Sequence, residues 1–336
     1  MAWRSVAAGV GGRAGRAWLC QGRASGGVAA CGAGCARRQL SLAGVYPPMP
    51  TPFLADESIA YDHLADNVAA WSKLPFRGLV VEGSNGEYVY LSPEERVELV
   101  HRVREFLPRK SDKLLLAGSG CESTRDTIAM SQRMAAAGAD AVMVVTPSYY
   151  KGGMKDKALH AHFTAVADNC PVPVILYSVP AFTVIDLSLD VILDLAQHPN
   201  IIGIKESGGD ISKIGSIVHK TRDADFQVLA GSASFLMATL QIGGVGGVCA
   251  LANVLGEAVC DLQTLVQQGN MADAVQLQRK LIAPNAAVTK GFGIPGLKQV
   301  MDWKGMYGGP TRAPLQPLTQ QETDKLRKVF TDTGYL

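Results

Sequence analysis

The first 55 residues of the chain contain neither aspartate nor glutamate, and the first acidic residue is Asp56. The first 40 residues also lack lysine, yet they carry six arginines among many alanines, glycines and serines: Arg4, Arg13, Arg16, Arg23, Arg37 and Arg38. This composition is typical of a mitochondrial transit peptide. We therefore predict a disordered transit peptide over residues 1–40, processing near residues 37–41 and a location in the mitochondrial matrix. A basic tail without a targeting role is the alternative.

The remainder of the chain has no excess of basic charge. Without the six leader arginines, 26 basic residues stand against 30 acidic ones, a formal charge of −4 with histidine neutral. A basic surface of the kind that binds nucleic acid is therefore not expected. No apolar run approaches the roughly 18 residues that a membrane span needs. We expect neither a nucleic acid nor a membrane as a partner.

Cysteine is scarce, and the motifs of metal and cofactor sites are missing. Of seven cysteines three lie in the leader, and the other four are too scattered for a disulfide framework or a metal knuckle: Cys121, Cys170, Cys249 and Cys260. The run 291–296 matches G-x-G-x-x-G, but no strand leads into it and Pro295 interrupts the expected helix start. The sequence predicts no metal and no organic cofactor.

The chain does contain short β-rich runs separated by helix-compatible segments. Eight such runs are present: 44–46, 78–81, 114–117, 141–145, 174–177, 201–205, 227–230 and 245–250. Strands that alternate with helices imply a parallel sheet, and eight units suit a closed (β/α)8 barrel. We predict an α/β fold with a TIM barrel over residues 41–256 and a C-terminal helical extension over residues 257–336.

Lys205 is the most informative single residue, because it ends the apolar run 201–205. Strand alternation predicts that Ile201, Gly203 and Lys205 share one face while Ile202 and Ile204 share the other. A buried lysine amine is more readily neutral and able to form a Schiff base with a carbonyl carbon. A structural lysine paired with a carboxylate such as Glu206 is the alternative.

Polar residues follow several of the other predicted strands. They are the runs 83–87 (Gly-Ser-Asn-Gly-Glu), 146–150 (Thr-Pro-Ser-Tyr-Tyr), 177–180 (Tyr-Ser-Val-Pro) and 231–232 (Gly-Ser). In a barrel the reactive groups lie at the carboxyl ends of strands, so this convergence favours a catalytic Lys205. Tyr177 should point inward and can transfer protons. Ser84 and Asn85 can donate hydrogen bonds to a carboxylate.

These motifs in this order resemble the dihydrodipicolinate synthase and N-acetylneuraminate lyase family of class I aldolases, from about residue 44 to the C-terminus. The resemblance implies that Lys205 forms the imine and that Tyr177 is the acid and base. It also implies that Ser84 and Asn85 hold the carboxylate of a 2-oxo acid substrate. No cofactor takes part in the implied chemistry.

The resemblance further implies an oligomeric site. Family members complete a proton relay with a tyrosine from a neighbouring subunit, which corresponds to Tyr149. A homotetramer built as a dimer of dimers is therefore expected. Ser207 and Gly231 would line the same pocket.

Details of the motifs favour one substrate within the family. Dihydrodipicolinate synthases carry an arginine where this chain has Phe182, and sialate lyases carry Phe-Thr where it has Glu206 and Ser207. We therefore expect cleavage of 4-hydroxy-2-oxoglutarate to pyruvate and glyoxylate. The alternatives are another pyruvate-releasing lyase, such as one that cleaves N-acetylneuraminate, and a catalytically silent barrel that binds a 2-oxo acid.

Val184 departs from the family pattern, in which glycine usually follows Thr183. A β-branched residue is expected to exclude a backbone with positive φ. Phe182 and Val184 together leave open which residue binds the distal carboxylate of the substrate.

Overall fold

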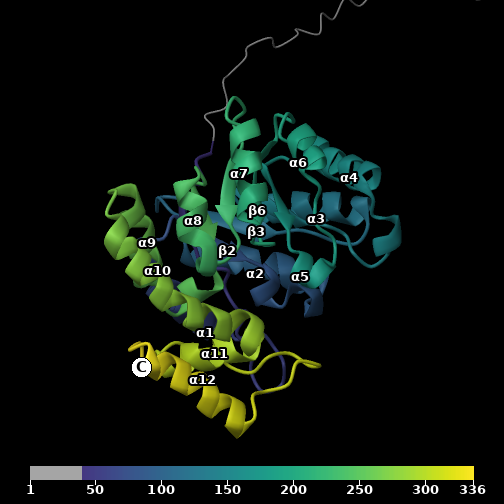
Figure 1. Cartoon of the computed structure of the whole chain (residues 1–336). Helices are drawn as coiled ribbons and strands as arrows, with labels where there is room; N and C mark the ends of the chain where they lie inside the picture. The colour runs from purple at the N-terminus through teal and green to yellow at the C-terminus, as the bar shows by residue number, and fades with distance from the viewer. Residues whose placement is uncertain (1–39) are drawn as a thin grey trace, which may run out of the picture. The chain divides into compact units, whose positions relative to one another are not determined.

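Eight parallel strands form the ring of a (β/α)8 barrel in the computed structural model, which describes residues 40–336 (Figure 1). Residues 1–39 of the predicted transit peptide lie outside the described residues. The strands are β1 (Gly44–Tyr46), β2 (Gly78–Val81), β3 (Leu114–Gly118), β4 (Ala141–Val145), β5 (Val174–Ser178), β6 (Ile201–Glu206), β7 (Gln227–Ala230) and β8 (Gly246–Val248). The predicted fold class is therefore confirmed.

Hydrogen bonds between β2 and the residues directly after β1 complete the ring. From β2 to β8 each strand pairs with its neighbours in the chain, and β1 pairs with β8. The N–H of Met49 donates to the carbonyl of Val80 at 2.9 Å, and the N–H of Val80 donates to the carbonyl of Pro47 at 3.1 Å. Because all strands run in parallel, their carboxyl ends meet at one rim of the barrel.

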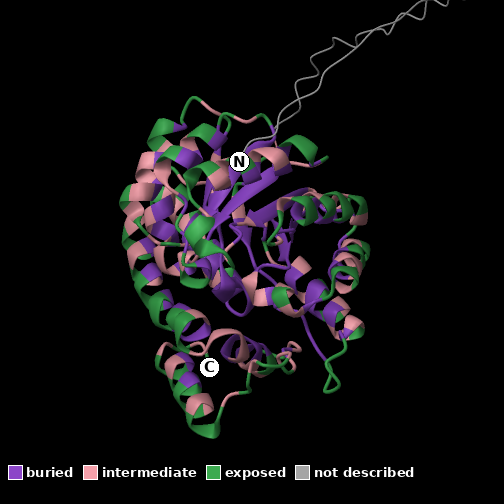
Figure 2. Ribbon diagram, turned by 90° about the vertical axis from the view of Figure 1, so that its right-hand side faces the viewer, coloured by how far each residue is buried: buried purple, intermediate pink, exposed green. Residues whose placement is uncertain are grey.

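Helices follow the strands and cover the outside of the ring. They are α1 (Tyr61–Ser72), α2 (Pro93–Phe106), α3 (Thr124–Ala137), α4 (Asp156–Asn169), α5 (Pro180–Thr183), α6 (Leu189–Leu195), α7 (Ile211–Lys220) and α8 (Leu236–Gln241). The start of α2 is a capping box, in which Ser92 and Glu95 each accept the other's backbone N–H. Figure 2 shows buried strands inside helices whose outer faces are exposed.

Strand β6 contains a bulge that simple alternation does not predict. Val174 pairs with Ile201, but the next residue, Ile175, pairs with Gly203, so Ile202 is the extra residue. Ile202 packs in the cluster inside the barrel, whereas Ile201 packs in the outer layer under the helices. The predicted common face of Ile201, Gly203 and Lys205 was therefore wrong.

The described chain forms helices after β8, and the predicted last strand, 245–250, was too long. The last strand is shorter than predicted, because residues Ala250–Asn253 form a 3-10 helix. The later elements are α9 (Gly256–Gln267), α10 (Met271–Ala286), a π-helix (Ala287–Gly291), α11 (Gly293–Trp303) and α12 (Gln320–Asp332). Pro295 lies in the first turn of α11 instead of blocking it, since first-turn N–H groups have no partner within a helix.

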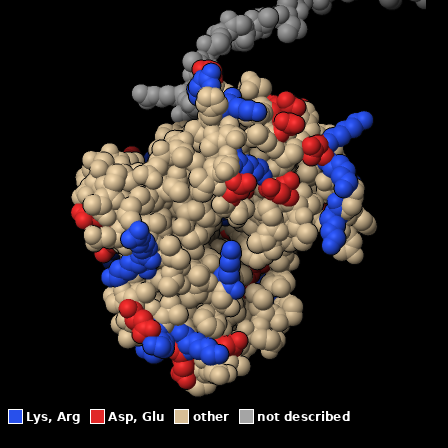
Figure 3. Space-filling view, viewed as in Figure 1, with Lys and Arg blue, Asp and Glu red and all other residues tan. Residues whose placement is uncertain are grey.

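The described residues have neither a membrane-spanning helix nor, on the face drawn in Figure 3, an extended patch of one charge. None of the helices between residues 40 and 336 has the length and apolar character of a membrane span. On the face that Figure 3 displays, most side chains are uncharged, and acidic and basic residues lie in small scattered groups.

Val184 adopts the left-handed conformation that its β-branched side chain was expected to exclude. Its φ is 58° and its ψ is 9°, and its N–H donates to the carbonyl of Pro180 at 3.0 Å to close α5. The side chain is 72% exposed, so it gains little from packing. The loop therefore holds a strained residue beside the carboxyl end of β5.

We predict that Val184→Gly stabilises the protein by about 1 kcal/mol, because relief of about 1–2 kcal/mol of left-handed strain exceeds the added backbone entropy of glycine. Denaturant unfolding measures the change. The matched control is Val89→Gly, since Val89 is also exposed but has no positive φ. Equal destabilisation by both substitutions would show that Val184 carries no such strain.

Candidate active site

Lys205 and Tyr177 face each other inside the barrel. They are paired residues of the adjacent strands β6 and β5, and the Lys205 Nζ lies 3.9 Å from the centroid of the Tyr177 ring. Lys205 is 3% exposed and Tyr177 is 4% exposed. The register of these two strands therefore brings an amine and a phenol together near their carboxyl ends.

Glu206 does not pair with Lys205. Its carboxylate accepts the N–H groups of Gly208 at 2.9 Å and Gly209 at 3.0 Å, and it is fully buried. Burial raises the pKa of Glu206, and those two hydrogen bonds oppose the rise. No ion pair joins Lys205 to a carboxylate within residues 40–336. The geometry thus disfavours the alternative of a structural ion pair and leaves the amine available for chemistry.

Ser84 supplies the first contact to the Tyr177 hydroxyl. Ser84 and Asn85 lie in a 3-10 turn (Ser84–Gly86) directly after β2. The Ser84 Oγ and the Tyr177 Oη are 3.2 Å apart, within hydrogen-bonding distance. The structure therefore places the predicted carboxylate-binding turn beside the Lys205 and Tyr177 pair.

Tyr149 is the predicted catalytic residue that the structure does not bring to this cluster. It lies after β4, is 77% exposed and packs edge to face on Tyr150, with ring centroids 5.0 Å apart. The N–H groups of Ser148 and Tyr149 both donate to Glu122 at 2.9 Å, which fixes the loop. No hydrogen bond or ring contact joins Tyr149 to Tyr177 within residues 40–336, and the assignment of Tyr149 to a neighbouring site stays a prediction.

Ser207 and Gly231 lie against each other just beyond β6 and β7. The Ser207 N–H donates to the carbonyl of Ser178 at 2.9 Å, whereas its Oγ is buried without a hydrogen-bond partner in the described chain. A Cβ added at Gly231 would lie 1.8 Å from that Oγ. Glycine is therefore required at 231 for Ser207 to keep its place, and the Ser207 hydroxyl remains free for a ligand.

Three neighbouring groups were not predicted as site residues. Burial raises the pKa of Cys249 to about 12, and nearby Lys205 opposes that rise. Burial also raises the pKa of Tyr88 to about 12, with Arg96 opposing and Tyr177 adding to the rise. The hydroxyl of Thr146 is buried without a partner in residues 40–336. The sequence did hold a signal for these groups. Thr146 and Cys249 directly follow β4 and β8, and Tyr88 directly follows the 83–87 turn.

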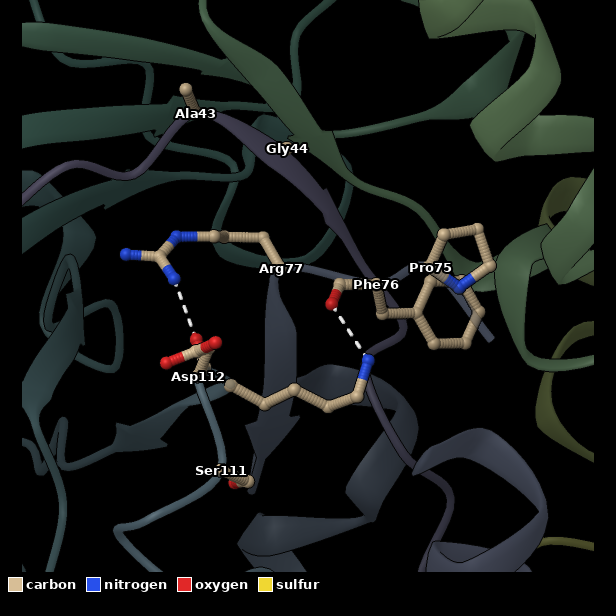
Figure 4. A pocket seen from close by; sticks show the side chains of 8 residues that line it. Ala43, Gly44, Pro75, Phe76, Arg77, Ser111 and Asp112 are labelled. Carbon is tan, nitrogen blue, oxygen red and sulfur yellow. Dashed lines mark hydrogen bonds between the residues drawn. The ribbon is translucent and has the colours of Figure 1, made fainter. Parts of the chain in front are cut away.

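A surface pocket lies at the opposite end of the barrel from these residues. It has a volume of about 460 Å³ and is lined by residues that start or precede β1, β2 and β3, among them Arg77 and Lys113 (Figure 4). Arg77 donates to the carbonyl of Asp112 at 2.6 Å, and Lys113 donates to those of Leu74 and Phe76. Both cationic side chains thus already donate hydrogen bonds to backbone carbonyls, and the pocket is remote from Lys205.

The part of the chain that the structure describes places no metal site at the cluster. Among residues 40–336, no group of three or more histidine, cysteine, aspartate or glutamate side chains is placed to hold a metal ion. What the arrangement offers is an amine, a phenol and hydroxyl donors. These groups suit imine formation and proton transfer at a carbonyl substrate.

The chain is similar to known proteins over most of its length. The model of the dihydrodipicolinate synthetase family matches residues 41–333. A 4-hydroxy-tetrahydrodipicolinate synthase from Methanothrix thermoacetophila is 35% identical over 290 residues, which cover 86% of this chain and 96% of that protein. A protein named probable 4-hydroxy-2-oxoglutarate aldolase, mitochondrial, from Emericella nidulans is 34% identical over 293 residues, covering 86% of this chain and 94% of that protein.

Solved structures show the same architecture. A dihydrodipicolinate synthase from Bacillus anthracis superposes with a TM-score of 0.83 at 28% identity, covering 87% of this chain and 99% of that one. A dihydrodipicolinate synthase from Acinetobacter baumannii, solved with pyruvate, also gives a TM-score of 0.83, at 26% identity, covering 88% of this chain and all of that one. The barrel and its C-terminal helices are thus shared.

We predict that Gly231→Ala destabilises the protein by about 1–3 kcal/mol, because the new methyl group overlaps Ser207 and the carbonyl of Glu206 at 2.7 Å. Since Glu206 follows Lys205 directly, activity should fall as well. Denaturant unfolding and a turnover assay measure both effects. Gly152→Ala is the control, because nothing lies within 4 Å of its added methyl group. Equal effects of the two substitutions would refute the crowding at Gly231.

Proposed function

The chain belongs to the dihydrodipicolinate synthetase family, and on that premise we propose that it is a class I aldolase that cleaves 4-hydroxy-2-oxoglutarate to pyruvate and glyoxylate. The observation that carries the proposal is the buried Lys205 amine, 3.9 Å from the Tyr177 ring and without a carboxylate partner in the described chain. An amine of this kind is suited to attack a ketone.

Imine formation starts the reaction. The Lys205 amine adds to the C2 carbonyl carbon of the substrate, and the carbinolamine hydroxyl takes the Tyr177 phenol proton and leaves as water. This leaves a protonated imine, which draws electrons toward C2, and the Tyr177 phenolate. Ser84 and Asn85 hold the adjacent C1 carboxylate with hydroxyl, amide and backbone N–H donors. Ser207 and Gly231 line the same pocket, where the unpartnered Ser207 hydroxyl is available as a further donor.

Cleavage then needs one base. The Tyr177 phenolate, linked to Ser84 at 3.2 Å, removes the proton of the C4 hydroxyl. The C3–C4 bond breaks, its electron pair forms the enamine, and glyoxylate leaves with its new aldehyde. Tyr177 returns the proton to C3, and water hydrolyses the imine to release pyruvate and restore Lys205.

The choice of substrate rests on Phe182 and on a relative. Phe182 is exposed on α5 at the position where the synthases carry arginine, so the guanidinium that would grip their substrate is missing from this position. The relative from Emericella nidulans bears the name of the proposed activity, and that name includes a mitochondrial location. The acid-free leader supports the same location for this chain.

The proposed assembly is a homotetramer made of two dimers. Tyr149 and Tyr150 project from the loop after β4 with more than three quarters of their surface exposed. In that assembly Tyr149 enters the site of the neighbouring subunit and completes the proton relay from Tyr177 through Ser84.

We predict that Lys205→Ala lowers kcat for 4-hydroxy-2-oxoglutarate cleavage by at least about 10³-fold without unfolding the protein, because the nucleophile is lost. Pyruvate release measures turnover, and circular dichroism confirms the fold. Lys220→Ala, which changes an exposed lysine of α7, is the control. Normal turnover by Lys205→Ala would refute the assignment. Faster turnover of N-acetylneuraminate, or of the synthase substrates, by wild-type protein would identify the competing activity.

We predict that Tyr177→Phe lowers kcat by about 10²- to 10⁴-fold while pyruvate still binds, because the ring beneath Lys205 is kept and only the hydroxyl is removed. Tyr46→Phe is a matched control, since Tyr46 is also a tyrosine inside the barrel but its hydroxyl donates to Leu42. Calorimetry measures pyruvate binding in each variant. A Tyr177→Phe enzyme that turns over like the control would exclude Tyr177 as the acid and base.

A further inference from the structure

The turn that follows β2 is strained at both ends. Glu82 precedes it with a φ of 58°, and Glu87 ends it with a φ of 56°. Residues other than glycine rarely adopt this left-handed conformation and need support from the surrounding structure. Between them lie Ser84 and Asn85, the proposed ligands of the substrate carboxylate. The contacts that hold Glu82 and Glu87 in this conformation therefore help to set the shape of the proposed binding site.

At the first end, Glu82 pairs with Arg96 of α2. The two side chains are buried, and the Arg96 Nε lies 2.8 Å from the Glu82 Oε2. Arg96 also donates to the carbonyl of Gly118 at 3.0 Å and to that of Gly120 at 3.4 Å. This end of the turn is thus held by elements of the barrel itself.

At the second end, the support comes from the C-terminal helices. The Glu87 Oε1 forms an ion pair with the Lys298 Nζ of α11 at 2.7 Å, and neither side chain is more than 1% exposed. Lys298 also donates to the carbonyl of Pro310 at 2.7 Å and lies 4.6 Å from the centroid of the Phe53 ring. These two contacts position the Lys298 side chain independently of Glu87.

Arg312 completes the support from the same segment. Its backbone N–H donates to the Glu87 Oε2 at 2.9 Å. Its guanidinium donates to both oxygens of Glu95, at 2.9 and 2.7 Å, and to the carbonyl of Tyr90 at 2.8 Å. Both carboxylate oxygens of Glu87 are thus held by groups between residues 298 and 312.

We propose that Lys298 is a positioning residue for the reaction, which holds the carboxylate-binding turn in its working shape through Glu87. The inference rests on the proposed function, since it assigns the C-terminal helices a role in binding the 2-oxo acid. A buried ion pair adds little net stability over a well-packed neutral pair of similar volume. The role that we assign to the Glu87–Lys298 ion pair is to fix the geometry of Ser84 and Asn85, which a neutral pair would not do.

The test replaces the ion pair by a neutral pair. Lys298→Met alone leaves a buried glutamate without its partner, so the informative variant is Glu87→Gln combined with Lys298→Met. We expect a melting temperature near that of wild type, and an apparent Kd for pyruvate and a KM for 4-hydroxy-2-oxoglutarate raised about 10- to 100-fold. Lys304→Met, which changes an exposed lysine just after α11, is the control and should leave both constants unchanged.

A second variant keeps the charge but moves it. Lys298→Arg should raise the same two constants several-fold, because the larger guanidinium displaces Glu87. If either variant folds and keeps the wild-type Kd for pyruvate and the wild-type KM for 4-hydroxy-2-oxoglutarate, Lys298 is not a positioning residue. This holds whether or not the melting temperature falls, and the proposed function would still stand. Failure of wild-type protein to bind pyruvate in the same calorimetric titration would instead overturn the proposed function, and this inference with it.

Discussion

The register between β5 and β6 places the two groups on which the proposed chemistry depends. It pairs Tyr177 with Lys205 and points both into the barrel, although a bulge at Ile202 shifts the alternation earlier in β6. Without that shift the residues that precede Lys205 would present the opposite faces. With it, an amine and a phenol lie together in a buried environment with no carboxylate partner for the amine in residues 40–336.

The second requirement is a rigid turn for the proposed binding of the substrate carboxylate, and the barrel alone does not hold this turn. The turn between Glu82 and Glu87 begins and ends in left-handed backbone, and each glutamate meets a buried cation. Arg96 comes from the barrel layer, whereas Lys298 comes from α11, below the barrel in Figure 1. The C-terminal helices thereby take part in the site without contributing a residue that touches the proposed substrate.

Local patterns in the sequence were enough to predict the strands and the candidate lysine, since apolar runs such as 201–205 are local signals. They did not predict the bulge at Ile202, which depends on the pairing partner, or the left-handed Val184, which the surrounding loop imposes. Lys298 was missed for a different reason: its partner Glu87 is distant in the chain, and Pro295 argued against the helix that carries it.

Imine formation at Lys205 is tested most directly by borohydride reduction of the wild-type protein mixed with pyruvate, followed by peptide mass spectrometry. Borohydride converts an imine to a stable secondary amine, so the modified peptide identifies the nucleophile. We expect a pyruvate adduct on Lys205 and on no other lysine. A protein that binds pyruvate yet yields no adduct, or yields one at a different lysine, would contradict imine formation at Lys205.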